Sequence, residues 1–125
     1  MTKNNMEFRY LVTAPDLNAH GSLHGGILMK WVDEACGMQA RIITGGVCAT
    51  RHIGDIDFCD TARLGDIIEI TVKHQNTGKT SLTFSANAFV LVTSDVAKRK
   101  IASFDRVVFV AIDHQGNPVI HGISR

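Results

Sequence analysis

The chain has 125 residues, 45% hydrophobic and 20% charged, and this length leaves room for one domain, residues 1–125. Thirteen basic and twelve acidic side chains give a formal charge of +1, without the basic excess of a general nucleic-acid binder. The longest apolar run, at 107–112, is far shorter than the roughly 20 residues of a membrane span, and the start MTKNNMEFRY lacks the apolar core of a secretory signal. We therefore expect a soluble cytoplasmic protein that binds neither nucleic acid nor a membrane.

The cysteines and histidines do not form a recognisable metal or disulfide pattern. Cys36, Cys48 and Cys59 are odd in number and widely spaced, unlike a disulfide framework or the close cysteine pairs of a zinc site. His20 and His24 are four residues apart, but in a predicted loop, and the other histidines are scattered. We expect reduced thiols and no metal site.

Residues 6–13 alternate between apolar and polar side chains, which predicts a half-buried strand. Met6, Phe8 and Tyr10 share its apolar side. Residues 14–21 then contain proline, aspartate, asparagine and glycine, so the chain must leave extended structure there. We expect this loop to adjoin the functional site.

Residues 26–43 contain no proline, and their apolar side chains recur at helical spacing. Leu28, Trp31 and Ala35 mark one face of this predicted helix. Because apolar residues also fill much of the remaining circumference, we expect a central helix enclosed on most sides.

Four further stretches favour strands, at about 47–59, 67–76, 80–93 and 101–112. Turn sequences rich in glycine, asparagine and aspartate separate them, and strands joined by short turns pair antiparallel as a meander. One long helix and about five strands predict an α+β fold in which a curved antiparallel sheet wraps the helix. Since so small a sheet leaves an exposed edge, we also expect dimers formed by edge-strand pairing.

The first candidate site lies along the predicted helix. Gly26 and Asp33 are seven residues apart, nearly two turns, so they share one face about 10 Å apart along the axis. The unpaired N–H groups of Gly25 and Gly26, at the positive end of the helix dipole, suit an oxyanion. Aspartate in mid-helix among apolar neighbours costs stability unless its carboxylate is used. The alternative is that Asp33 joins Lys30 and Glu34 on a solvated stripe.

The spacing of these groups favours a site shared between two chains. A water activated by Asp33 and the N–H groups that hold a carbonyl oxygen must both lie about 3 Å from the reacting centre, and two turns of one helix are too far apart. Two copies of the helix, antiparallel across a dimer axis, would bring Asp33 of one copy to the helix start of the other. Asn18, in the loop before the helix, could donate to the same carbonyl; its alternative role is a turn residue.

Two basic segments carry weaker signals. The sequence Gly78-Lys79-Thr80 imitates the end of a phosphate-binding loop, but that motif requires glycine where Lys73 stands, so a hairpin turn is expected. The cluster at 98–100, Lys-Arg-Lys, predicts a solvated loop, with phosphate anchoring as the alternative.

The stretch from Asn18 to Gly37 reads NAHGSLHGGILMKWVDEACG. It resembles the N-x-x-G-x-x-x-G-G-x-x-x-x-x-x-D-E-x-x-G signature of hot-dog-fold acyl-CoA thioesterases, specifically the YciA-like enzymes and the cytosolic acyl-CoA hydrolases. Weaker similarity continues in the same order at residues 63–66, 78–81 and 109–118, so the resemblance covers nearly the whole chain.

The resemblance implies a hot-dog fold and hydrolysis of acyl-CoA to free acid and CoA, with no cofactor apart from the CoA of the substrate. It implies that Asp33 and Asn18 act together across a dimer interface, and that dimers assemble into tetramers or hexamers. With Asp33 as general base or nucleophile, Asn18 and the N–H of Gly25 or Gly26 would hold the oxyanion. One departure is Gly54, where the family often has an acidic residue.

The residues expected to contact the substrate carry imidazole, hydroxyl or cationic groups: His24, Lys79, Thr80, Ser81, Lys98, Arg99 and Lys100. Two other activities stay open. A hot-dog dehydratase or hydratase acting on acyl thioesters needs a histidine paired with a carboxylate, for which His24 is the candidate. The other is a non-enzymatic acyl-CoA sensor.

Overall fold

The computed structural model describes residues 5–92 and 97–122. Their elements, in chain order, are β1 (Asn5–Leu11), the short 3-10 helix η1 (Ala14–Asp16), α1 (Gly25–Thr44), β2 (Cys48–Phe58), β3 (Ile67–Thr77), β4 (Ser81–Leu91) and β5 (Lys98–Ala111). The predicted α+β class is confirmed, and the predicted helix and strand boundaries shift by at most three residues. Residue 93, the last of one predicted strand, lies outside the described residues.

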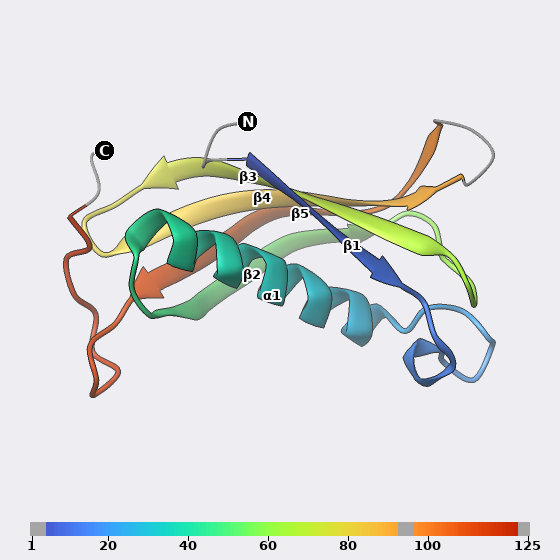
Figure 1. Cartoon of the computed structure of the whole chain (residues 1–125), viewed down its shortest axis with the longest axis horizontal. Coiled ribbons are helices and arrows are strands. Elements are labelled where there is room, and N and C mark those ends of the chain that lie inside the picture. Colours follow the sequence, from blue (N-terminus) through green and yellow to red (C-terminus); the bar gives the residue numbers. More distant parts are fainter. Residues whose placement is uncertain (1–4, 93–96, 123–125) are drawn as a thin grey trace.

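The strands form one antiparallel sheet in the order β1-β3-β4-β5-β2. Figure 1 shows this sheet curving over α1. The predicted meander holds for β3, β4 and β5, but β2 pairs with β5 at the far side of the sheet and not with β3. The connection at 59–66 allows this, since eight residues can reach about 26 Å and three interstrand spacings need roughly 14 Å.

The predicted hairpin between β3 and β4 is confirmed. Its turn is closed by the Gly78 N–H, which donates to the Ser81 carbonyl oxygen at 2.9 Å. The register then continues from Thr77 opposite Leu82 to Ile67 opposite Leu91, with one irregularity near His74.

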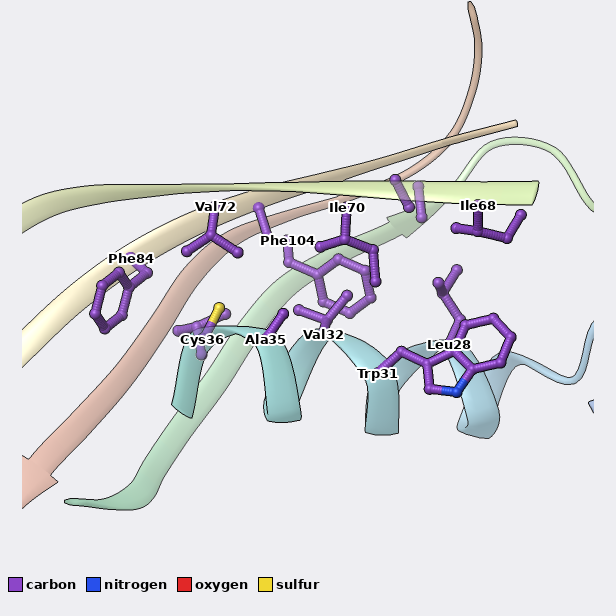
Figure 2. Packing of buried hydrophobic residues seen from close by; sticks show 14 of the residues in the cluster. Leu28, Trp31, Val32, Ala35, Cys36, Ile68, Ile70, Val72, Phe84 and Phe104 are labelled. Atoms are coloured by element: carbon purple, nitrogen blue, oxygen red, sulfur yellow. The ribbon is translucent and has the colours of Figure 1, made fainter. Parts of the chain in front are cut away.

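The core lies between α1 and the concave face of the sheet. Along β4, alternate residues from Leu82 to Val90 are buried, and this period of two directs them toward the helix. Figure 2 shows Val32 and Cys36 of α1 pointing toward Ile70 and Phe84 of the sheet. Apolar burial on this scale is the main stabilising contribution to such a fold.

The helix begins and ends at residues suited to those positions. His24 precedes the first turn, and its Nδ1 accepts a hydrogen bond from the Gly26 N–H at 2.9 Å. At the other end Gly45 has φ +73°, a left-handed conformation that glycine adopts without a steric penalty, and its N–H donates to the Arg41 carbonyl oxygen.

One stripe of α1 stays exposed in a single chain. Lys30 and Glu34 are exposed, and 45% of the surface of Met38 and 50% of that of Ile42 are accessible to solvent. The expected enclosure of the helix on most sides is confirmed, because the exposed residues of α1 fall on one stripe and the rest are buried or half-buried. An apolar strip is left for another surface to cover.

Among residues 5–92 and 97–122, no helix combines the length and apolarity needed to cross a bilayer. The three cysteines are free thiols: Cys36 is buried, Cys48 is half-buried and Cys59 is exposed.

Candidate active site

Asp33 lies on the side of α1 that faces β2, in a half-buried position. Its Oδ1 accepts a hydrogen bond of 2.5 Å from the Thr50 hydroxyl. The neighbouring Lys30 and Glu34 are exposed instead. Asp33 thus differs from Lys30 and Glu34 in having a hydrogen-bond partner on β2.

Thr50 was not among the residues predicted from the sequence, although a signal for it exists. From Asp33 to Thr44 the helix rises about 16 Å, and the five residues 46–50 that follow the reversal can return at most about 16 Å. A chain that reverses at Gly45 therefore brings the start of β2 back to the level of Asp33. Thr50 faces the helix because it pairs with Phe109 of β5, and local patterns do not reveal which strand β2 pairs with.

The start of α1 presents two backbone N–H groups, and they differ. The Gly26 N–H donates to His24, as described above, so it is already engaged. The Gly25 N–H has no hydrogen-bond partner within the described part of the chain. Of the two predicted oxyanion donors, Gly25 is the one that remains open.

The loop before α1 is organised by Asn18. Its Oδ1 accepts from the backbone N–H groups of His20 at 2.9 Å and Ser22 at 3.1 Å, which is the turn-forming role expected of asparagine. The Nδ2 group of Asn18 has no partner in residues 5–92 and 97–122 and remains available as a donor. The two roles are compatible because they use different atoms of the same amide.

Within one chain, the structure does not join the oxyanion donors to Asp33. No hydrogen bond among the described residues links Asp33 to Asn18 or Gly25. Gly25 begins the helix and Asp33 lies eight residues later, which is about 12 Å along the axis.

The residues predicted to contact CoA lie at opposite ends of the sheet. Lys79 and Thr80 form the β3–β4 turn near the end of α1, and Ser81 begins β4 opposite Val110. Lys98 pairs with Leu91 at the other end of the same two strands. In one chain the two groups therefore do not form a single phosphate site.

The predicted loop at 98–100 is wrong, because these residues begin β5. Arg99 forms an ion pair of 2.7 Å with Asp60 and donates to the Thr61 carbonyl oxygen at 2.8 Å. Lys98 forms an ion pair with Glu69. Long-range partners on β3 and on the 59–66 connection thus determine where these side chains lie, and a charge run alone does not reveal such partners.

Glu69 is a buried carboxylate that the sequence did not single out. Only 1% of it is exposed, and it is held between Lys98 and Arg9, whose Nη2 lies 3.0 Å away. Burial acts to raise the pKa of Glu69, but the hydrogen bonds and charges of Lys98 and Arg9 outweigh it and hold the pKa below the ordinary value of 4.5. This group ties β1, β3 and β5 together on the face away from α1.

Cys36 neighbours Asp33 on the helix but is not a nucleophile candidate. Burial raises the pKa of its thiol to about 12, and the negative charge of Asp33 adds to this. The thiol therefore stays protonated at neutral pH. Across residues 5–92 and 97–122, no three or more His, Cys, Asp or Glu side chains gather in a way that could hold a metal ion.

Comparison with known proteins identifies the family. The family model of the thioesterase superfamily matches residues 20–97, more than half of the chain. The chain belongs to the thioesterase superfamily. The predicted family and hot-dog fold are thereby confirmed, and the five-stranded antiparallel sheet over one long helix is the fold of its solved relatives.

Relatives of this superfamily member match most of its length. An uncharacterized acyl-CoA thioester hydrolase of Buchnera aphidicola is 27% identical, with 93% of this chain and 87% of that protein covered. The acyl-CoA thioester hydrolase YciA of Salmonella typhimurium is 25% identical, with coverages of 93% and 89%. A hexameric thioesterase from Yersinia pestis superposes with a TM-score of 0.84 at 26% identity, covering 90% of this chain and 91% of that one.

Proposed function

We propose that this chain hydrolyses acyl-CoA thioesters to free acid and CoA, with Asp33 as general base or nucleophile. The observation that carries the proposal is the half-buried Asp33 carboxylate in the middle of α1, oriented by the Thr50 hydroxyl. The relatives named acyl-CoA thioester hydrolases support the choice of substrate.

A single carboxylate suits a thioester. The leaving thiolate belongs to a thiol with a pKa near 8.5, so it departs without a strong general acid, whereas an amine leaving group needs a proton. Thr50 occupies Oδ1 of Asp33 and leaves Oδ2 without a partner among the described residues, so this oxygen can accept a proton from water or attack the thioester carbonyl.

The oxyanion is held, in this proposal, by the Gly25 N–H and the Nδ2 group of Asn18. Both donors are open in the described structure, and the positive end of the helix dipole adds to them. Because they lie too far from Asp33 along one helix, the site requires the helix start of a second copy.

Two features of the chain support such a dimer. The strand β2 is at one edge of the sheet, and edge-strand pairing across a two-fold axis would continue the sheet into the second copy. Met38 and Ile42 leave an apolar strip on α1 that a second helix would cover. The Yersinia relative is a hexamer, in line with further assembly of dimers into tetramers or hexamers.

The dehydratase alternative has less support. It needs His24 as a proton-transfer group paired with a carboxylate, and the Nδ1 of His24 instead accepts from the Gly26 N–H at the start of the helix. No ion pair to His24 occurs within the part of the chain that the structure describes.

The activity is tested by release of free thiol from a series of acyl-CoA substrates, with Asp33→Asn as the decisive variant. We expect Asp33→Asn to lower kcat by several orders of magnitude, because an amide neither accepts the proton nor attacks. Glu34→Gln, which removes the exposed neighbouring carboxylate, is the matched control and keeps wild-type kcat. Full activity of Asp33→Asn would refute the proposed mechanism, and thioester binding without thiol release would favour the sensor.

The shared site is tested by complementation between two inactive chains. Asp33→Asn and Asn18→Ala are purified separately, then mixed and allowed to exchange subunits. If the site combines Asp33 of one copy with Asn18 of the other, each mixed dimer contains one intact site, and random mixing restores about one quarter of the wild-type activity. If each chain contains its own complete site, mixing restores nothing.

Single turnover in oxygen-18 water separates the two roles of Asp33. Label that enters the Asp33 carboxylate indicates an anhydride opened at the aspartyl carbonyl, whereas label that enters only the product acid fits direct attack by water or opening of the anhydride at its acyl carbonyl.

A further inference from the structure

A polar pocket of about 320 Å³ lies on the sheet near the β3–β4 turn. Arginines from two strands line it, Arg51 on β2 and Arg106 on β5, together with His52. Asn76 on β3 and the hydroxyl residues Ser81 and Thr83 on β4 also line it.

This pocket is on the face of the sheet opposite α1. On β4, Leu82 and Phe84 are buried toward the helix, so Ser81 and Thr83 project from the other face. On β2 the Thr50 side chain reaches Asp33 of α1, and the next residue, Arg51, lines the pocket behind the sheet. The pocket is therefore separate from the proposed thioester site.

The cations of the pocket lack counterions. Arg51 and Arg106 form no ion pair within residues 5–92 and 97–122, whereas Arg9 and Arg99 each have a carboxylate partner. Among the residues that the structure describes, no carboxylate lines the pocket. Because positive groups on adjacent strands repel each other, their convergence on one concave site favours an anion between them.

The position of His52 depends on a neighbouring glycine. A Cβ atom at residue 54 would come 2.5 Å from Nε2 of His52, so the imidazole lies over Gly54. Gly54 pairs with Arg106 across the strands. The absence of a side chain at residue 54 thus leaves room for the imidazole of His52, which lines the pocket together with Arg106.

We propose that this pocket binds a phosphate group, either free or carried by a nucleotide. Guanidinium groups match the geometry of phosphate oxygens and donate paired hydrogen bonds to them, and hydroxyl groups add further donors. A volume of about 320 Å³ accommodates a phosphate or diphosphate. Ser81, expected from the sequence to contact CoA, is one of its donors, and binding here does not require the thioesterase activity.

The proposal is tested by calorimetric titration of the full chain with inorganic phosphate, pyrophosphate and ADP at low ionic strength. We expect Arg51→Gln and Arg106→Gln each to weaken pyrophosphate binding by about tenfold or more, because each removes a charge-assisted donor. Lys73→Gln removes a positive charge from the exposed residue after Val72 on β3, outside this pocket, and is the matched control. The affinity of Lys73→Gln for pyrophosphate should stay within about twofold of wild type.

The ligands distinguish the source of the phosphate. Equal affinities for pyrophosphate and ADP indicate recognition of the phosphate groups alone, and tighter binding of ADP indicates a nucleotide; both outcomes support the pocket. Thr83→Val tests the same pocket should an arginine variant fail to fold.

Absence of binding at millimolar ligand, or equal weakening by Lys73→Gln, overturns the inference. Asp33→Asn should keep the wild-type phosphate affinity, so this proposal and the proposed hydrolase activity can fail independently.

Discussion

Replacing Thr50 by valine isolates the hydrogen bond that orients Asp33. Valine has nearly the same shape and suits a strand equally well, so the change removes only the hydroxyl that donates to Oδ1 at 2.5 Å. A hydrogen bond to a charged group contributes about 1.5–3 kcal/mol. If this bond must hold the carboxylate in the transition state, Thr50→Val lowers kcat by roughly 10- to 150-fold, at about 1.4 kcal/mol for each factor of ten.

The fold should tolerate this change. Thr50 is exposed, so the carboxylate that loses its partner is rehydrated, and we expect the free energy of unfolding to fall by less than about 1 kcal/mol. The assay is thiol release from acyl-CoA at saturating and limiting substrate, with denaturant unfolding of the same samples. Thr50→Ser restores the hydroxyl and should recover most of kcat. Wild-type kcat in Thr50→Val, or no recovery in Thr50→Ser, would refute the positioning role.

Three further predictions concern groups outside the reaction. Because the folded-state pKa of Glu69 is lowered, its ion pairs stabilise the protein above pH 4.5, and this stabilisation is lost as the pH falls through the folded-state pKa. Urea unfolding from pH 7 to pH 3 should therefore show a smaller loss of stability in Glu69→Gln than in wild type. Because Cys36 is buried and its thiol has a pKa of about 12, it should resist iodoacetamide at pH 8 until the chain unfolds, while the exposed Cys59 reacts. Mass spectrometry of the peptides measures the alkylation of each cysteine. Phe84→Ala should lower the free energy of unfolding by about 3–5 kcal/mol, because its ring is fully buried between α1 and the sheet; a loss below 1 kcal/mol would contradict this packing.

The elements of this protein were predictable because their patterns are local. A period of two on β4 and a period near 3.6 on α1 arise from the geometry of neighbouring residues, so the sequence alone locates both within a few positions. The turn at Gly78 and the mid-helix Asp33 were also visible from residue types and spacing. The N–H groups at the start of the helix followed from the glycine pair that opens it.

Tertiary structure alone decided which distant groups meet. The eight-residue connection at 59–66 is long enough for β2 to pair with either β3 or β5, and no local preference distinguishes the two. Pairing of β2 with β5 determines which arginines converge on the pocket behind the sheet, and the pairing of Thr50 with Phe109 places Thr50 on the face of the sheet that meets α1. The ion pair of Lys98 with Glu69 joins strands that are far apart in the sequence. The arrangement of the strands in the sheet, and not the residues next to Lys98 in the chain, determines this partner.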